Sequence, residues 1–164
     1  MAWWLMQKYR LILLFVSLFA FLPAEIASSN SSESSQLLHA HPLEITTQSG
    51  QNYHFSVRFA LTAQQQKQGL MFVRHLPPMM GMVFVFSPPR KTRFWMRNTL
   101  IPLDMIFIAP DGIISKIVTR HDTQSDMTTS SDIPVAGVLE IAAGEALRLG
   151  ISAGDVVSHR LIKF

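Results

Sequence analysis

The residue types best suited to ligand chemistry stand together in the segment 94–99, which reads FWMRNT. Side chains alternate along a strand, so the phenylalanine and the methionine should face the core while Trp95 and Arg97 face outward. An indole beside a guanidinium, followed by the amide of Asn98 and the hydroxyl of Thr99, is typical of a site that stacks and hydrogen-bonds a small polar ligand. Alternatively, Trp95 plugs one end of the fold and Asn98 satisfies bend amides.

A carboxylate interrupts the otherwise apolar segment Leu103–Ile108, which predicts a buried strand. A buried carboxylate needs partners, and we expect Asp104 to pair with Arg97, with Arg74, or with backbone N–H groups of the 98–100 bend. Asp104 is therefore either an internal tie that orders the bend or a further member of the ligand site.

Glu140 raises the same question in the apolar run Val138-Leu139-Glu140-Ile141. If Asp104 and Glu140 faced one cavity, they could act as the acid and base of an enzyme. That is an alternative to the binding hypothesis, and their spacing in the sequence does not bring them together.

The methionines Met79, Met80 and Met82 offer a third kind of chemistry. Thioethers are soft ligands that suit Cu(I), and His39 and His41 add two imidazoles. Methionine also fills irregular cores without binding anything, so the alternatives are a Cu(I)-handling protein and ordinary packing.

Motifs of the common enzyme classes are absent from the sequence. It contains no nucleophile elbow, P-loop, dinucleotide-binding glycine pattern or zinc-protease helix. The residues therefore favour a binding or accessory module over an enzyme, and they imply no cofactor.

The N-terminal segment predicts export. Lys8 and Arg10 precede the uncharged run 11–22, which is short for a membrane span and has the length of a signal-peptide core. We expect a signal peptide over residues 1–27 and a periplasmic or extracellular location. If uncleaved, this segment would anchor the protein, and it is the only expected membrane contact. The Ser-rich stretch 28–42 predicts a disordered linker.

Composition limits the partners further. The formal net charge is +3 and no basic face suited to nucleic acid is evident, so we expect a small polar ligand or an envelope protein instead. The sequence has no cysteine, so a core rather than disulfides must hold the domain together.

The remaining chain, 43–164, predicts a single mainly β domain. Alternation in Tyr53–Phe59 indicates a strand with one solvated face, and with the segment 43–47 it predicts a hairpin. Thr62 followed by Gln65 forms a capping-box pattern, which predicts a short helix ending at Gly69. Further strands are expected at the ranges 82–86, 94–96, 103–108, 113–119, 135–141 and 156–164, and a second short helix at 144–149. We expect a small closed or nearly closed β barrel or sandwich with two short helices, preceded by the signal helix.

Three stretches carry a family likeness, namely GLMFVRHLPPMMGMVFVF (69–86), FWMRNTLIPLDMIFIAPDG (94–112) and VLEIAAGEALRLGISAGD (138–155). In them the chain resembles the uncharacterised family catalogued as domain of unknown function 192, over about residues 43–164. The family's usual lysine after the Trp-Met pair is Arg97 here, which keeps the charge. The resemblance implies a small, mainly β domain, often exported, with no assigned activity.

Overall fold

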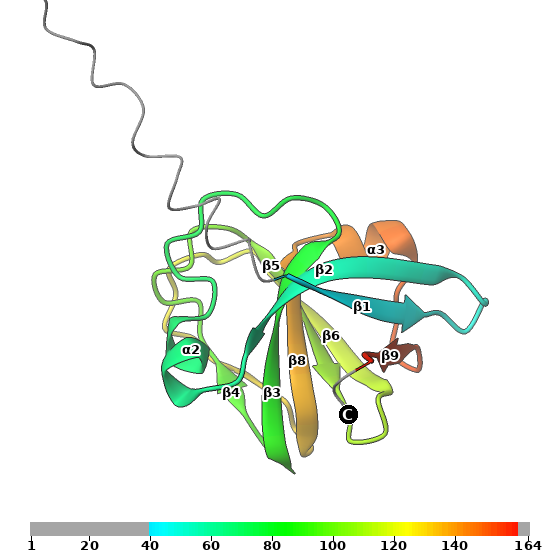
Figure 1. Cartoon of the computed structure of the whole chain (residues 1–164). Helices are drawn as coiled ribbons and strands as arrows, with labels where there is room; N and C mark the ends of the chain where they lie inside the picture. Colours follow the sequence, from blue (N-terminus) through cyan, green and yellow to red (C-terminus); the bar gives the residue numbers. More distant parts are fainter. Residues whose placement is uncertain (1–39, 161–164) are drawn as a thin grey trace, which may run out of the picture. The chain divides into compact units, whose positions relative to one another are not determined.

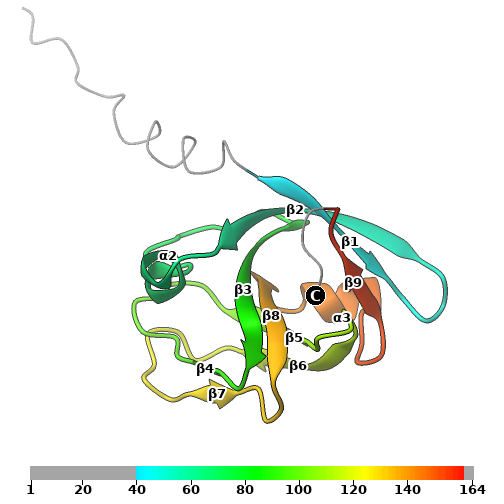
Figure 2. The ribbon, with the colours of Figure 1, turned by 60° about the horizontal axis from the view of Figure 1, so that its bottom comes forward.

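The computed structural model describes residues 40–160, a mainly β domain with two short helices (Figures 1 and 2). The predicted signal peptide, and the predicted linker up to residue 39, lie outside the described residues. The larger sheet has seven strands in the order β6-β5-β8-β3-β2-β1-β9, and β4 pairs with β7 in a separate ribbon. The strands are β1 His41–Thr46, β2 Asn52–Ala60, β3 Met80–Arg90, β4 Arg93–Phe94, β5 Leu103–Ile108, β6 Ile114–Arg120, β7 Thr129–Ser130, β8 Val135–Ala142 and β9 Val156–Ser158.

The predicted first hairpin is confirmed. β1 and β2 pair antiparallel, with Leu43 opposite Phe55 and Ile45 opposite Tyr53. Leu43, Ile45 and Phe55 are fully buried, as expected for the apolar face of a strand whose other face meets water. The strand begins at His41, two residues before the predicted start.

A crossover joins β2 to β3, because these two strands are parallel and a tight turn cannot connect them. It carries α2 (Ala63–Gln68), where Thr62 and Gln65 form the predicted capping box and Gly69 ends the helix. The Gln66 side chain donates to the backbone carbonyls of Ala60 and Val85. These bonds hold α2 beside β3, and both views place α2 and β4 on the side of β3 away from β9.

Two clusters of buried residues lie on the two faces of the sheet, because side chains alternate along its central strands. The Ile106 core contains Leu43, Ile45, Phe55, Val57, Val83, Ile106, Ile108, Ile114, Leu139, Ile141, Ala146, Ile151 and Val157. The Phe107 core contains Ala60, Leu70, Met82, Phe84, Phe86, Met96, Leu103, Met105, Phe107, Val135 and Val138. The sheet curls into a half-barrel around the first cluster, and its two edges meet in an isolated bridge between Ile113 and Val156.

Several strand boundaries differ from the sequence-based prediction, most of all those of β3 and β9. β3 continues to Arg90, although the polar segment 87–93 suggested a solvated connection, because this exposed end still pairs with Val135 of β8. β9 ends at Ser158, and residues 159–160 are not strand. The second helix is confirmed as α3 (Glu145–Leu149). Within residues 40–160, neither helix reaches the length and apolarity that crossing a bilayer requires.

Candidate functional site

The segment 94–99 alternates as its sequence predicts. Phe94 packs edge-on against Phe84, with ring centroids 5.0 Å apart, and Met96 is fully buried. Trp95 exposes 42% of its surface, a large fraction for an indole. It is therefore available to a ligand, and it does not plug the interior of the domain.

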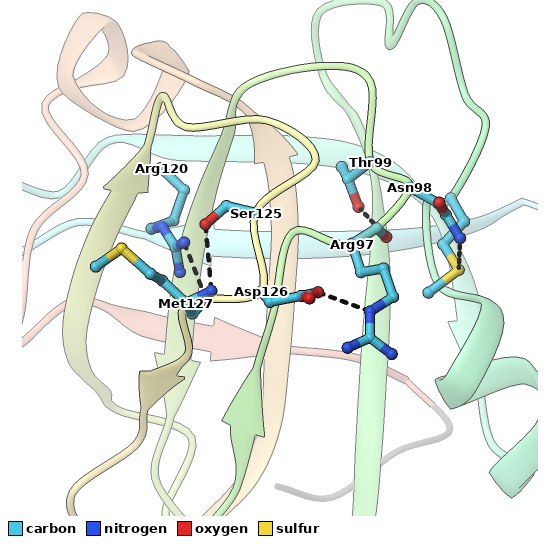
Figure 3. Close-up of polar contacts among 8 residues, drawn as sticks. Arg97, Asn98, Thr99, Arg120, Ser125, Asp126 and Met127 are labelled. Carbon is cyan, nitrogen blue, oxygen red and sulfur yellow. Dashed lines mark hydrogen bonds and ion pairs between the residues drawn. The ribbon is translucent and has the colours of Figure 1, made fainter.

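Arg97 lies against Trp95 and is paired with an acid. Its guanidinium is 4.8 Å from the centre of the indole, a cation–π geometry. Its Nε donates to Asp126 Oδ1 at 2.7 Å, and this bond raises the pKa of Arg97 and lowers that of Asp126 (Figure 3). Because Asp126 already neutralises it, Arg97 stiffens the indole and is not a free anion clamp.

Asn98 and Thr99 turn the chain away from the strand. Asn98 has a left-handed backbone, with a φ of 56°, and its amide donates to the sulfur of Met71 at 3.9 Å. Its carbonyl accepts from the N–H of Phe72. Thr99 is buried, and its hydroxyl donates to the carbonyl of Arg97. Asn98 therefore fixes the bend against the crossover, as Figure 3 shows for its amide, and Thr99 closes the bend locally.

The loop that carries Asp126 is tied down by Arg120, which is almost completely buried. Arg120 donates to both carboxylate oxygens of Asp122, to the Thr129 hydroxyl and to the carbonyl of Met127. The side-chain hydrogen bond to Arg120 holds the pKa of Asp122 well below its usual range. Because the loop is fixed this way, Asp126 stays in place against Arg97.

A pocket of about 250 Å³ opens between the crossover, β3 and the 92–99 segment. Its lining mixes aromatic, cationic and hydrogen-bonding side chains, and it comprises Gln66, Lys67, Gln68, Gly69, Leu70, Met71, Phe84, Phe86, Arg90, Thr92, Arg93, Phe94, Trp95, Thr99 and Glu140. Trp95 and Thr99 belong to both the predicted ligand site and this pocket. Arg97, Asn98 and Asp104 do not line it.

Glu140 is the one acidic residue in the lining. It exposes only 4% of its surface, and no group among residues 40–160 forms a hydrogen bond or ion pair with its carboxyl. Burial alone raises its pKa to about 8. Among residues 40–160, the one fully buried side-chain oxygen or nitrogen without a hydrogen-bond partner is Oε2 of Glu145. The oxygens of Glu140 also lack a partner, so they are not fully buried and must be accessible from the pocket. Glu140 is therefore a protonated carboxyl at neutral pH that faces this space.

Three cations line the same pocket. Arg90 lies over the ring of Phe86 at 4.8 Å and donates to Gln66 Oε1. Lys67 and Arg93 are exposed, and no acidic side chain within residues 40–160 pairs with either. With Glu140 neutral, the pocket carries a net positive charge.

The prediction that Asp104 pairs with Arg97, Arg74 or the 98–100 bend is wrong. Asp104 exposes 1% of its surface and accepts from the Thr119 hydroxyl at 2.7 Å and from the backbone N–H of Ala146 at 3.0 Å. Neither Arg97 nor Arg74 contacts it, because its side chain points to the other face of β5. Asp104 ties β6 and the start of α3 together and does not order the 98–100 bend.

The proposed acid–base pair is also excluded by the register. Glu140 lies opposite Met105 on β5, whereas Asp104 lies opposite Ile141. Residues opposite each other share a face and neighbours alternate, so the two carboxyls lie on opposite faces of the sheet.

The methionines 79, 80 and 82 do not gather into one ligand set. Met82 belongs to the Phe107 core, whereas Met79 packs against the Ile106 core. No group of three or more His, Asp or Glu side chains within residues 40–160 is arranged to hold a metal ion.

Sequence reasoning missed the cationic lining. The run Arg90-Lys91-Thr92-Arg93 predicts either a solvated connection or a docking patch for an anionic surface, and no pattern links Lys67 on the short helix to it. The available signal was Phe84 and Phe86, which stand two residues apart on one expected strand and therefore share a face shortly before these cations in the sequence.

One comparison with known proteins identifies a family, and its members are described as uncharacterised. The family model described as DUF192, uncharacterised ACR, matches residues 44–159. The chain is similar to a candidate transcription regulator from Sinorhizobium meliloti, with 40% identity and a TM-score of 0.71 over 73% of this chain and 93% of that one. It is also similar to a protein of unknown function from Novosphingobium aromaticivorans, with 38% identity and a TM-score of 0.70 over 73% of this chain and 85% of that one. No curated protein matches it.

Proposed function

Because the chain belongs to the DUF192 family of uncharacterised proteins, we propose its function from its own pocket: it binds a small anion that has a flat apolar body. The observation that carries this proposal is the lining, in which aromatic rings and unpaired cations surround one space. The proposal keeps the hypothesis of a ligand beside Trp95 and moves its charged contacts from Arg97 to Lys67, Arg90 and Arg93.

The apolar part of the ligand is suggested by the ring geometry. Phe94 packs edge-on against Phe84 and Phe86, and the guanidinium of Arg97 lies over the ring of Trp95. Rings fixed in this way lose little freedom when a flat molecule stacks on them. The volume, about 250 Å³, is slightly below the usual range for ligand pockets and suits a small molecule rather than a chain segment.

The charge of the ligand is suggested by the cations. Lys67 and Arg93 are available to donate charge-assisted hydrogen bonds, and Arg90 presents a planar guanidinium that Gln66 orients. No carboxylate of the lining opposes them at neutral pH, so an anion is favoured over a neutral or cationic molecule of the same shape.

The proposal also includes export to the periplasm or the outside of the cell. It rests on Lys8, Arg10 and the uncharged apolar run 11–22, which together have the arrangement of a signal peptide. Comparing the N-terminal sequence and the cellular fraction of the expressed protein tests this part. Recovery of the protein in the cytoplasm with residues 1–27 still attached would contradict export.

The binding proposal is tested by calorimetry on the full chain with three probes of matched shape, namely benzoate, benzyl alcohol and benzylamine. We expect benzoate to bind at least about tenfold tighter than the other two. Lys67→Gln and Arg93→Gln should each lower the affinity for benzoate. Lys91→Gln is the control, because Lys91 is an exposed neighbour outside the lining.

Two results would contradict the proposal. Equal binding of the anionic and neutral probes would remove the role of the cations. Equal loss of benzoate affinity in Lys91→Gln and Arg93→Gln would show a general surface attraction in place of a pocket contact.

A further inference from the structure

We propose that Glu140 selects the ligand by donating a hydrogen bond from a protonated carboxyl to a neutral acceptor, such as a carbonyl oxygen, at the end of the ligand remote from its anionic group. This inference rests on the proposed function and adds the chemical class, an elongated anion with an acceptor at its inner end.

The geometry leaves the Glu140 carboxyl without a hydrogen-bond partner among residues 40–160. It lies in a cross-strand row between Met82 of β3 and Met105 of β5, so its nearest neighbours on the sheet are thioethers. Thioether sulfur is a weak acceptor, and no hydrogen bond joins these groups in the part of the chain that the structure describes. A buried O–H without an acceptor is costly, and a ligand acceptor would remove that cost.

The charged groups around Glu140 do not ionise it. Lys67, Arg90 and Arg93 line the pocket from α2, β3 and β4, and Arg58 lies in the same cross-strand row two strands away. Asp104 on β5 points to the opposite face. Burial is the one cause of the raised pKa of Glu140, about 8, and none of these charges contributes to it. The carboxyl therefore keeps its proton below that pH.

The length of the ligand follows from the register of β8. Glu140 is opposite Met82, whereas Val135 is opposite Arg90. These positions on β8 are five residues apart, or about 17 Å along an extended strand. Arg90 and Glu140 both line the pocket, so a ligand with its anionic group near Arg90 and its acceptor near Glu140 would contact both.

The test uses calorimetry on the full chain at pH 6.5 with two probes of matched shape. 4-Acetylbenzoate carries a carbonyl acceptor, and 4-isopropylbenzoate lacks one. We expect 4-acetylbenzoate to bind about tenfold tighter. Glu140→Gln should keep this preference because its amide also donates, and Glu140→Leu should abolish it. Glu44→Gln is the control, because Glu44 is half-buried on β1 outside the pocket lining and should not change the preference.

A second arm varies the pH from 6.5 to 9.5, so that the inference remains testable if Glu140→Leu fails to fold. The preference for 4-acetylbenzoate should fall through about pH 8 in the natural protein, where Glu140 loses its proton, and stay level in Glu140→Gln. Ionisation of Glu140 also places a negative charge in the pocket of a bound anion, so both probes should bind more weakly at high pH.

The outcomes separate the two proposals. Equal affinity for the two probes, or a preference that survives in Glu140→Leu, overturns the role of Glu140 and leaves the anion pocket standing. A preference that stays level across the pH series in the natural protein also overturns that role. Failure of both probes to bind the natural protein at any pH overturns the proposed function and this inference with it.

Discussion

Asp104 on β5 and Glu140 on β8 occupy adjacent strands but opposite faces of the sheet, because Glu140 is paired with Met105 and Asp104 with Ile141. Asp104 accepts two hydrogen bonds, from Thr119 and Ala146. Glu140 has none within residues 40–160 and faces a pocket. Two buried carboxyls of one sheet therefore have different roles, one in holding the fold and one in recognition.

Glu140→Gln is expected to remove a pH dependence of stability. The folded pKa of about 8 is above the ordinary value of 4.5, so the folded protein binds more protons than the unfolded chain between these values. The free energy of unfolding should therefore fall as the pH rises through this window, by up to about 1.4 kcal/mol per pH unit. Urea unfolding of the full chain at several pH values measures this slope. Glu44→Gln should retain the fall, and an unchanged slope in Glu140→Gln would show that other groups cause it.

Asp104→Ala is expected to lower the free energy of unfolding by about 2–4 kcal/mol, because the buried backbone N–H of Ala146 and the Thr119 hydroxyl lose their acceptor. Thr119→Val removes one of the two bonds and should cost about 1 kcal/mol. Urea unfolding compares the two variants. A loss in Asp104→Ala no larger than in Thr119→Val would mean that the tie to Ala146 contributes nothing.

Trp95→Ala is expected to abolish binding of benzoate while leaving the fold intact, because much of the indole is exposed. Met96→Ala is the matched comparison, since the neighbouring side chain is fully buried and should cost about 2–5 kcal/mol. Calorimetry gives the binding and thermal unfolding gives the stability. If Trp95→Ala unfolded as readily as Met96→Ala, the indole would be a packing residue after all.

Arg120→Met is expected to release the loop that holds Asp126 against Arg97. The four hydrogen bonds to Asp122, Thr129 and Met127 would be lost, so amide exchange in residues 121–128 should accelerate. Asp122→Asn should accelerate the same amides less, because the bonds to Thr129 and Met127 remain. Protection that is unchanged in both variants would assign the order of the loop to its backbone bonds, such as Met96 N–H to Ser125.

The contribution of Asp122 to the stability of this loop depends on pH with the opposite sign to that of Glu140. The pKa of Asp122 is lowered on folding, so its bond to Arg120 is present at and above the ordinary carboxyl range. Its contribution is lost only as the pH falls through the folded value, in strongly acidic solution.

The sequence predicted the features that depend on residues close together in the chain. Alternation placed Phe94 and Met96 inside and Trp95 outside, and Thr62 with Gln65 formed the capping box. Each depends on neighbours a few residues apart. The family resemblance is likewise confirmed over residues 44–159.

Partners that depend on strand register were not predictable from the sequence. Asp104 contacts Thr119 because the two residues are opposite each other where β5 pairs with β6. It accepts from the N–H of Ala146 because α3 packs next to β5. The isolation of Glu140 follows from its place between Met82 and Met105. A shift of one residue in either pairing would turn these side chains to the other face, and composition does not reveal that shift.

The crossover 61–79 has a further consequence for how this domain can change. It supplies one wall of the pocket, yet the residues that pair in the sheet begin only after it, at Met80. Insertions or substitutions in α2 and the segment after it would alter the shape and charge of the pocket without changing the register of any strand. Because Glu140 lies on β8 and outside the crossover, such changes would remodel the pocket while the position of its carboxyl in the sheet stays the same.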